Sequence, residues 1–419
     1  MAFATSWLRD KAVFQEFIQE LPGRNTGIIL VIPAYNEPHV TMTLDSLADC
    51  DKPDCEVEVL VVINAPLKAP QEHLEGNLLT LANIESWKKA HKNCFFRLFS
   101  IKPDVTTDDW GVGLARKTGM DEALRRFNKI DKPDGVILCL DADCTVKHDY
   151  ITSICNEFFL MKDRTACSVY FEHPLSGNEY PGIYYTSILS YELHLRYYYQ
   201  GLILSGYPYP TQTTGSAMAV KALTYIKAGG MNRKQAGEDF YFIQKLASSD
   251  GYFYLNSTAV YPSPRSSYRV PFGTGASIEK LISSPGSDFL TYNPNAFEDL
   301  KATFLILPEL YDKDDVEISG LYERLPNSIK LFIPADELKS KIDEIRRNTG
   351  SYSSFSKRFF GWFNMFKVVK YLNFIHREHI PRVPVNKAAT SLLKKSGVSR
   401  EFKNDYELLE FYRSLERGY

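Results

Sequence analysis

The chain of 419 residues lacks the features that mark several large classes of protein. It has no uncharged apolar run long enough to cross a bilayer, and residues 1–20 mix charged and apolar side chains, unlike a secretory signal. Its net charge of -2 shows no basic excess of the kind found in nucleic-acid-binding proteins. We therefore expect no membrane span and no nucleic-acid partner, and a cytoplasmic protein that at most touches the inner face of a membrane.

The seven cysteines lack the pattern of a disulfide framework or a zinc site. Their number is odd, none belongs to a Cys-x-x-Cys pair, and several lie in apolar runs. We expect reduced, mostly buried thiols.

Short apolar runs alternate with segments of helical spacing through the first part of the chain. The expected strands are 27–33, 57–63, 95–101, 135–140 and 166–171, followed by two short ones at 252–255 and 259–261. Helical segments separate them, including 72–90, 111–128 and 149–161. This alternation predicts an α/β fold with a doubly wound, mostly parallel sheet flanked by helices. The pattern becomes mainly helical from about residue 281, so we expect one domain over 1–280 and a helical C-terminal region over 281–419.

Two aspartates follow the fourth expected strand, in Asp141-Ala142-Asp143. Ligands of open α/β sheets bind beyond the carboxyl ends of the strands. Two carboxylates there form a hard oxygen site suited to Mg²⁺ or Mn²⁺ carrying the phosphates of a substrate. The alternative is a surface turn, in which Asp is a favoured residue.

A second acidic pair, Glu238-Asp239, follows Gly237 at the start of a predicted helix. Acids are common in the first turn of a helix for electrostatic reasons alone. A Pro/Gly/Ser-rich loop then carries Arg265 and Arg269. Arginine donates in a planar fork to phosphate oxygens, so this loop either binds pyrophosphate or is a connector.

The segment Gly111–Gly119 is rich in glycine and follows the third expected strand. Its glycines do not have G-x-G-x-x-G spacing, which excludes a dinucleotide fingerprint. Arg116 and Lys117 lie near the start of the predicted helix, where they face either an anion or solvent.

The order of these motifs resembles that of family 2 glycosyltransferases with the GT-A fold. The resemblance covers about residues 25–280 and rests on Pro33-Ala34-Tyr35-Asn36-Glu37, Gly113-x-Ala115-Arg116, Asp141-Ala142-Asp143, Gly237-Glu238-Asp239 and the basic loop that follows. It implies a nucleotide-sugar half at about 25–145 and an acceptor half at about 146–280.

The same resemblance implies roles for individual residues. Asp141 would lie near the ribose or the metal, and Asp143 would bind the Mg²⁺ or Mn²⁺ that bridges the diphosphate. Asp239 would be the base that deprotonates the acceptor hydroxyl, and Glu238 would orient the acceptor. The remaining donor-binding residues would be Pro33, Ala34, Tyr35, Glu37 and Asn64 at the base and ribose, with Arg116, Arg265 and Arg269 toward the diphosphate.

Three positions depart from the family pattern. Asn64 stands where many members have an acid that reads the base, and Lys117 stands where Asn is common. No histidine follows the last strand, where several GT-A enzymes have another metal ligand, so either His173 or water would take that place.

The resemblance implies a hexosyltransferase that uses a nucleoside-diphosphate sugar and inverts the anomeric centre. The acceptor would be a glycan, a lipid-linked sugar or a small molecule. One alternative is a catalytically silent sugar-nucleotide or glycan-binding protein of the same fold. Another is a nucleotidyltransferase, although that class carries a Gly-rich basic loop after its first strand, where this chain has Ala34–Glu37.

Residues 353–379 combine aromatic and basic side chains at helical spacing. Such a helix can lie in a membrane interface and bring an enzyme to a lipid-linked acceptor. The favoured interpretation is that the aromatic side chains pack against the catalytic domain or a second subunit, because most helices of globular proteins are amphipathic.

Overall fold

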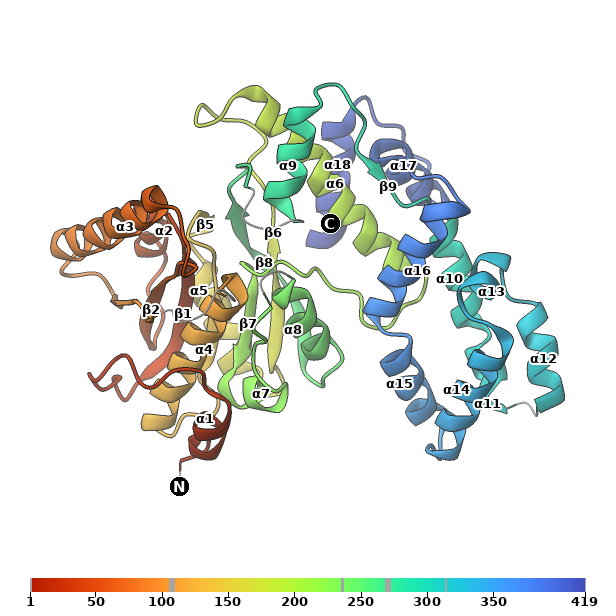
Figure 1. Ribbon diagram of the computed structural model, residues 1–419, viewed down its shortest axis with the longest axis horizontal. Helices are drawn as coiled ribbons and strands as arrows, with labels where there is room; N and C mark the ends of the chain where they lie inside the picture. Colours follow the sequence, from red (N-terminus) through yellow and green to blue (C-terminus); the bar gives the residue numbers. More distant parts are fainter. Residues whose placement is uncertain (1, 105–109, 235–236, 268–272, 313–314, 419) are drawn as a thin grey trace. The chain divides into compact units, whose positions relative to one another are not determined.

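The computed structural model describes residues 2–104, 110–234, 237–267, 273–312 and 315–418 (Figure 1). The chain divides into two compact units. The first consists of Met1–Ile188, Thr211–Ile282 and Leu415–Tyr419, and the second of Leu189–Pro210 and Ser283–Ser414.

The first unit is built on an eight-stranded sheet with the order β3-β2-β1-β4-β7-β6-β8-β5. Its strands are β1 Thr26–Ala34, β2 Glu56–Ile63, β3 Phe96–Ile101, β4 Val136–Cys139, β5 Cys144–Val146, β6 Ala166–Phe171, β7 Met218–Lys221 and β8 Tyr252–Pro262. The pairs β3-β2, β2-β1, β1-β4 and β6-β8 are parallel, whereas β7 runs antiparallel to both of its neighbours and β5 antiparallel to β8. The predicted α/β class with a helical C-terminal region is confirmed, and the sheet is mixed beyond β4.

The helices of the first unit are α1 Thr5–Lys11, α2 Val40–Ala48, α3 Gln71–Ala90, α4 Val112–Lys129, α5 Tyr150–Cys155, the π-helix η1 Asn156–Leu160, α7 Ala222–Lys227, α8 Glu238–Ala247 and α9 Thr274–Ser283, while α6 Gly182–Leu204 passes from the first unit into the second. Of these, α2, α3, α4, α5, α7 and α8 contact strands of the sheet. β1 is buried along its whole length, which explains its continuous apolar sequence.

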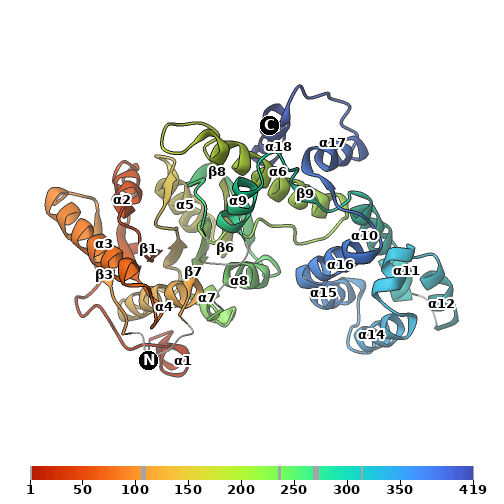
Figure 2. The same cartoon turned by 45° about the horizontal axis from the view of Figure 1, so that its top comes forward.

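Two neighbouring helices, α2 and α3, lie side by side in both views of the ribbon (Figure 2). The indole nitrogen Nε1 of Trp87 on α3 donates to Oδ1 of Asp45 on α2 at 2.6 Å. This bond ties together the helices that follow β1 and β2.

The helix α4 lies very close to the sheet. A Cβ atom on Gly119 would meet Cγ1 of Val31 at 2.3 Å, so only glycine permits this approach. Leu124 and Phe127 of the same helix are fully buried against the strands. α4 therefore has a fixed position over β1, and this also fixes the positions of the residues at its N-terminus.

Two expectations about the elements are wrong in detail. The single helix expected over 149–161 is α5 followed by η1. The two short strands expected at 252–255 and 259–261 are one strand, β8. Residues from Tyr252 to Val260 pair with β6, and residues from Val260 to Pro262 pair with β5. Backbone pairing therefore continues through both expected segments and joins them in one strand.

The second unit is mainly helical. Its helices are α10 Asn295–Leu305, α11 Leu307–Asp312, α12 Asp315–Glu323, α13 Asn327–Phe332, α14 Ala335–Arg347, α15 Tyr352–Trp362, α16 Met365–Glu378, α17 Val385–Lys395 and most of α18 Asp405–Arg417, with a small antiparallel pair, β9 Leu290–Thr291 and β10 Val383–Pro384. The aromatic segment 353–379 falls into α15 and α16. Phe355, Phe359, Phe363 and Tyr371 are buried, and their aromatic partners belong to this same unit.

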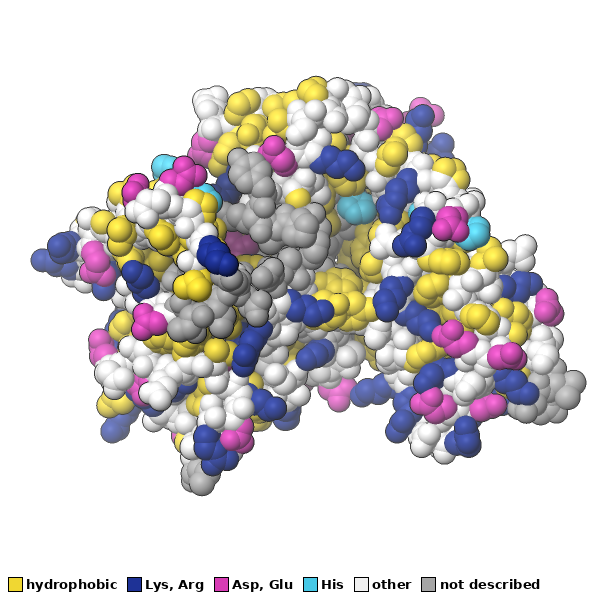
Figure 3. Space-filling model, in the orientation of Figure 1, with side chains coloured by type: hydrophobic (Ala, Val, Ile, Leu, Met, Phe, Trp, Pro, Cys, Tyr) yellow, Lys and Arg dark blue, Asp and Glu magenta, His cyan; other side chains and the backbone are white. Residues whose placement is uncertain are grey.

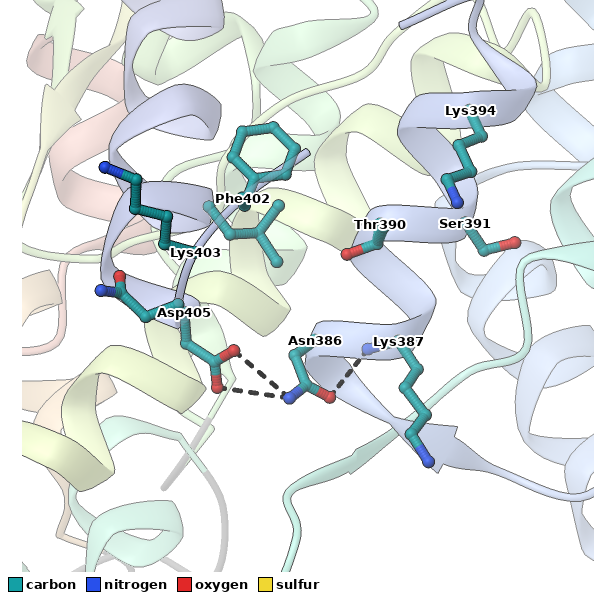
Figure 4. A pocket seen from close by; sticks show the side chains of 10 residues that line it. Asn386, Lys387, Thr390, Ser391, Lys394, Phe402, Lys403 and Asp405 are labelled. Atoms are coloured by element: carbon teal, nitrogen blue, oxygen red, sulfur yellow. Dashed lines mark hydrogen bonds between the residues drawn. The ribbon is translucent and has the colours of Figure 1, made fainter. Parts of the chain in front are cut away.

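A pocket of about 530 Å³ lies between α17 and the start of α18 in the second unit (Figure 4). Asn386 donates from its amide to Asp405 across this pocket at 3.2 Å. The exposed Lys387 and Lys394 also line it, and Phe402 lies on the α18 side. None of the candidate site residues lines this pocket.

On the face drawn in Figure 3, basic and acidic side chains are interspersed, in keeping with the net charge of -2. Every helix in the described part of the chain is too short or too polar to span a lipid bilayer.

Candidate functional site

The carboxyl ends of three parallel strands bring the predicted motifs to one edge of the sheet. Ala34 at the end of β1 is in register with Ile63 at the end of β2, and Val31 is in register with Cys139 at the end of β4. The segments that follow these strands are Tyr35–Glu37, Asn64 and the Asp141–Asp143 turn. They therefore leave the sheet at neighbouring positions.

The Asp141–Asp143 turn is held from both sides. It connects β4 to β5, a short strand that the sequence did not reveal. The hydroxyl group of Thr43 on α2 donates to the carbonyl oxygen of Ala142 at 2.9 Å. The backbone N–H of Cys144 donates to the Asp141 carbonyl oxygen at 3.1 Å. The two carboxylates thus project from a backbone that is fixed by hydrogen bonds.

The loop after β1 is tied to the end of β2 through α3. Asn36 has a φ of 53°, in the left-handed region that Asn tolerates better than most residues. Its backbone N–H donates to Oδ1 of Asn77 at 2.7 Å, and Nδ2 of Asn77 donates to the carbonyl oxygen of Asn64 at 2.9 Å. Asn77 therefore connects both segments, a role that no local sequence pattern indicated.

Two predicted donor-binding residues are engaged in contacts within the protein. The side chain of Asn64 is buried. With its amide nitrogen toward the Ala34 carbonyl oxygen, Asn64 donates to that oxygen at 2.8 Å and accepts from Nε1 of Trp110 at 2.8 Å. The hydroxyl group of Tyr35 lies 2.8 Å from Nδ1 of His73. These bonds fix the side chains that surround the predicted base pocket.

Arg265 joins the basic loop to two of the predicted acidic residues. Its Nε atom lies 2.6 Å from Oδ2 of Asp143. Its Nη1 atom donates to Oε2 of Glu37 at 2.9 Å, and Nη2 bonds to the other oxygen of the same carboxylate. The guanidinium thus uses its planar fork on Glu37 while also contacting Asp143.

Arg116 makes the equivalent connection on the other side of the turn. The side chain is buried, and Nη2 donates to Oδ1 of Asp141 at 2.5 Å while Nη1 bonds to Glu238. A Cβ atom on Gly215 would lie 2.5 Å from Nη1 of Arg116, so glycine leaves the space that the guanidinium fills. One arginine of α4 thereby joins the β4–β5 turn to the start of α8.

The acidic pair at the start of α8 has two distinct environments. Burial raises the pKa of Glu238 to about 7, although the nearby Arg116 opposes this shift. Burial also raises the pKa of Asp239, again against the attraction of Arg116. Asp239 is only partly buried, and its Oδ1 accepts from the backbone N–H of Phe240 at 2.7 Å. A raised pKa makes either carboxylate a stronger base, but Glu238 is buried and bonded to Arg116, whereas Asp239 is more exposed, so Asp239 is the better placed of the two for proton transfer.

The described side chains of the cluster include more acids than bases. Among the described side chains, five carboxyl groups lie near two guanidinium groups, so ionised acids outnumber bases in this part of the site; the acids are Glu37, Asp141, Asp143, Glu238 and Asp239, and the bases are Arg116 and Arg265. An added cation would reduce this excess, since like charges at short range repel.

The donor set fits a magnesium or manganese ion shared with a substrate. Within the described residues, no three side chains of His, Cys, Asp or Glu gather to form a metal site by themselves. Mg²⁺ is usually held by only one or two carboxylates together with substrate phosphates and water. Asp141 and Asp143 can supply such a pair of carboxylates, although each also bonds to an arginine.

Two other candidate residues do not join this cluster of described side chains. Lys117 is buried on α4 and pairs with Asp121 at 2.9 Å, so its charge is compensated within the core. His173 is buried beside Phe171 and does not complete a three-ligand group with the two aspartates among the described side chains. Arg269 lies outside the described residues.

No protein-family model and no curated protein sequence matches the chain. Among the solved structures that resemble it is S. aureus TarS 1-349, with 14% identity and a TM-score of 0.39 over 78% of this chain and 92% of that chain. A second is the mannosyltransferase PcManGT from Pyrobaculum calidifontis in complex with GDP-Man and Mn²⁺, with 13% identity and a TM-score of 0.34 over 99% and 91%. A third is glucosyl-3-phosphoglycerate synthase from Mycobacterium tuberculosis, with 11% identity and a TM-score of 0.33 over 59% and 77%. These TM-scores are low, so no residue role is transferred to this chain from them.

Proposed function

We propose that the chain is a glycosyltransferase that moves a hexose from a nucleoside-diphosphate sugar to an acceptor hydroxyl. The observation that carries this proposal is the cluster at the carboxyl edge of the sheet. There, Asp141, Asp143 and Asp239 are brought together with Arg116 and Arg265. The cluster combines groups suited to a diphosphate with a carboxylate suited to proton transfer.

Donor binding follows from the two halves of this cluster. The segment from Pro33 to Glu37, together with Asn64, would border the base and ribose. Arg265 would turn from Glu37 and Asp143 toward the diphosphate, because phosphate oxygens offer the same paired acceptors as a carboxylate. Arg269 is proposed for the same role. A Mg²⁺ or Mn²⁺ ion held by Asp143 and Asp141 would neutralise charge that develops on the leaving diphosphate.

Asp239 is proposed as the base. The acceptor oxygen forms a bond to the anomeric carbon while the bond from that carbon to the diphosphate oxygen breaks. The acceptor proton passes to the Asp239 carboxylate, and the diphosphate leaves with the bonding electron pair. A single displacement of this kind inverts the anomeric centre.

Glu238 is proposed to act on the acceptor only through its neighbours. Its side chain is 1% exposed and bonds to Arg116, so it fixes the guanidinium and the start of α8. The resemblance implied that Glu238 orients the acceptor, and here it is proposed to do so through Arg116 and the start of α8. The acceptor itself is proposed to be a glycan, a lipid-linked sugar or a small molecule.

A panel of nucleoside-diphosphate sugars tests this function. Binding and hydrolysis of UDP-, GDP- and other NDP-sugars are measured with Mn²⁺, with Mg²⁺ and with a chelator. We expect at least one donor to bind more tightly with the metal and to be hydrolysed slowly. Absence of binding to every donor would overturn the proposal, and binding without hydrolysis or transfer would instead support a catalytically silent sugar-nucleotide-binding protein.

A further inference from the structure

Two cysteines that are far apart in sequence meet in the first unit. Sγ of Cys55 lies 3.4 Å from Sγ of Cys155. Cys55 directly precedes β2, whereas Cys155 ends α5 where the helix changes to the π-helix η1. Both thiols are reduced and only half-buried, so a small oxidant can reach them.

The surroundings of Cys55 are closely packed. A Cβ atom on Gly27 would meet Cβ and Sγ of Cys55 at 2.7 Å, so the absence of a side chain there leaves the space that Cys55 fills. Phe159 of η1 lies against the same glycine, and Nζ of Lys132 lies 5.7 Å from the centre of the Phe159 ring. Residues of β1 and η1 therefore lie beside Cys55.

We propose that Cys55 and Cys155 are an oxidation site at which a reversible disulfide forms. An S–S bond measures about 2.05 Å, so the sulfur atoms must approach by roughly 1.4 Å, a distance that side-chain rotation and a small backbone shift can supply. The remaining described cysteines show no such sulfur–sulfur contact.

The electrostatic setting distinguishes the two thiols. The contact with Cys155, followed by the charge of Lys132, lowers the pKa of Cys55 against the effect of burial. The contact with Cys55, together with burial, raises the pKa of Cys155. The charge of Lys132 favours the thiolate of either cysteine, so one thiol attacks an oxidant and the other resolves the product.

With hydrogen peroxide as the oxidant and Cys55 as the attacking thiol, the chemistry balances in two steps. The Cys55 thiolate attacks one peroxide oxygen, the O–O bond breaks, and a sulfenic acid and one water form after proton transfer. The Cys155 sulfur then attacks the Cys55 sulfur, the S–O bond breaks, and the thiol proton leaves with the hydroxide as a second water. The two thiols lose two electrons, and peroxide gains them.

The disulfide lies away from the proposed catalytic cluster. Cys55 adjoins the first residue of β2, whereas Asn64 follows its last, and the strand from Glu56 to Ile63 spans roughly 26 Å at about 3.3 Å per residue. Oxidation is therefore expected to change stability more than donor binding. Failure of the glycosyltransferase proposal would leave this inference unaffected.

Mass spectrometry of the full-length protein tests the inference. After treatment with hydrogen peroxide, the protein should lose the mass of two hydrogen atoms, and a non-reducing peptide map should contain a peptide linking Cys55 to Cys155. Dithiothreitol should reverse the change. Cys55→Ser and Cys155→Ser should abolish the linked peptide, whereas Cys94→Ser, which replaces another half-buried thiol, should leave it unchanged.

Thermal unfolding supplies a second measurement. The bridge closes a loop of about a hundred residues, so the oxidised protein should melt several degrees above the reduced protein. Cys55→Ser should melt at the same temperature in both conditions. Oxidation of Cys55 and Cys155 to separate sulfinic acids, without a linked peptide, would overturn the inference.

Discussion

Single arginines set the charge balance of the proposed catalytic cluster. Arg116 contacts Asp141 and Glu238, and Arg265 contacts Asp143 and Glu37. Each guanidinium therefore joins carboxylates from different segments of the chain. Replacing a carboxylate in this cluster changes both the charge available to a metal and the partners left to an arginine.

Asp239 provides the first test at the level of single residues. Asp239→Asn should retain donor binding and lower the rate of sugar transfer by roughly 10²–10⁴-fold, because an amide cannot accept the acceptor proton. Donor titration and transfer assays measure the two effects separately. Asp288→Asn, at an exposed position of the second unit, is the control and should leave both unchanged. Undiminished transfer by Asp239→Asn would remove this residue from the role of base.

Asp143 provides a second test. Asp143→Asn should weaken donor binding in Mn²⁺ by at least roughly tenfold. Loss of a residue that only hydrogen-bonds to a metal ligand already lowers metal affinity by about that factor. Binding measured in a chelator should change much less, because the variant retains Arg265 and Glu37. Equal losses with and without metal would argue that Asp143 contacts the donor by another route.

The acidic residues of the cluster could be predicted because each pair lies in a short motif. Asp141 and Asp143 follow an apolar run, and Glu238 and Asp239 open a helix. The partners of these acids could not be predicted in the same way. Glu37 and Arg265 are 228 positions apart, and no local pattern indicates that their side chains meet.

At the level of secondary structure, long buried elements were visible in the sequence and short ones were not. The apolar runs of β1 and β2 are interpreted as buried strands because segments of helical spacing alternate with them. β5 contains only Cys144–Val146, and its pairing with β8 depends on residues more than a hundred positions away. The change from α5 to η1 likewise has no distinct periodicity over so few residues.

The contact between α4 and the sheet gives a prediction for a whole element. Gly119→Ala should lower the free energy of unfolding by roughly 1–3 kcal/mol, because the new Cβ would meet Val31 at 2.3 Å and force the helix outward. Denaturant titration measures the change. The control is Gly361→Ala in α15, where a Cβ meets no atom within 4 Å, and it should be neutral or stabilising. Equal stability of the Gly119→Ala variant and the natural chain would show that α4 can shift without cost.

The division of the whole molecule into two units was only partly visible in the sequence. The loss of the alternating pattern near residue 281 marks the start of the helical region. The inclusion of Leu189–Pro210 in the second unit and of Leu415–Tyr419 in the first depends on contacts between distant segments. Glu416, for example, accepts from Gln212 and Tyr254 of the first unit. Composition does not indicate such contacts between residues that are far apart in the sequence.

The stability of the whole molecule should depend on pH through Glu238. Its pKa is about 7 in the folded protein against an ordinary value of 4.5, because burial disfavours the charged form. The folded state therefore holds more protons than the unfolded state between these values, and this contribution to stability falls as pH rises from about 4.5 to about 7.

Denaturant midpoints of the natural chain and of Glu238→Gln across this pH range measure the contribution. The stability of the natural chain relative to the variant should fall with rising pH up to about 7 and stay level above it. A difference that is constant from pH 4.5 to 7 would contradict the assigned origin of the shift.

The short connection between β4 and β5 also constrains the geometry of the sheet. β7, β6 and β8 lie between these two strands, so a flat sheet would place β4 and β5 about 19 Å apart at roughly 4.8 Å per strand. The chain from Cys139 to Cys144 can reach at most about 18 Å when fully extended, and the hydrogen bond from Cys144 to Asp141 shortens it further. The sheet must therefore curl. The short segment that carries Asp141 and Asp143 limits the distance between β4 and β5, and so it limits how flat the sheet can be. The segment proposed to bind the metal is therefore also the one that fixes the curvature of the sheet.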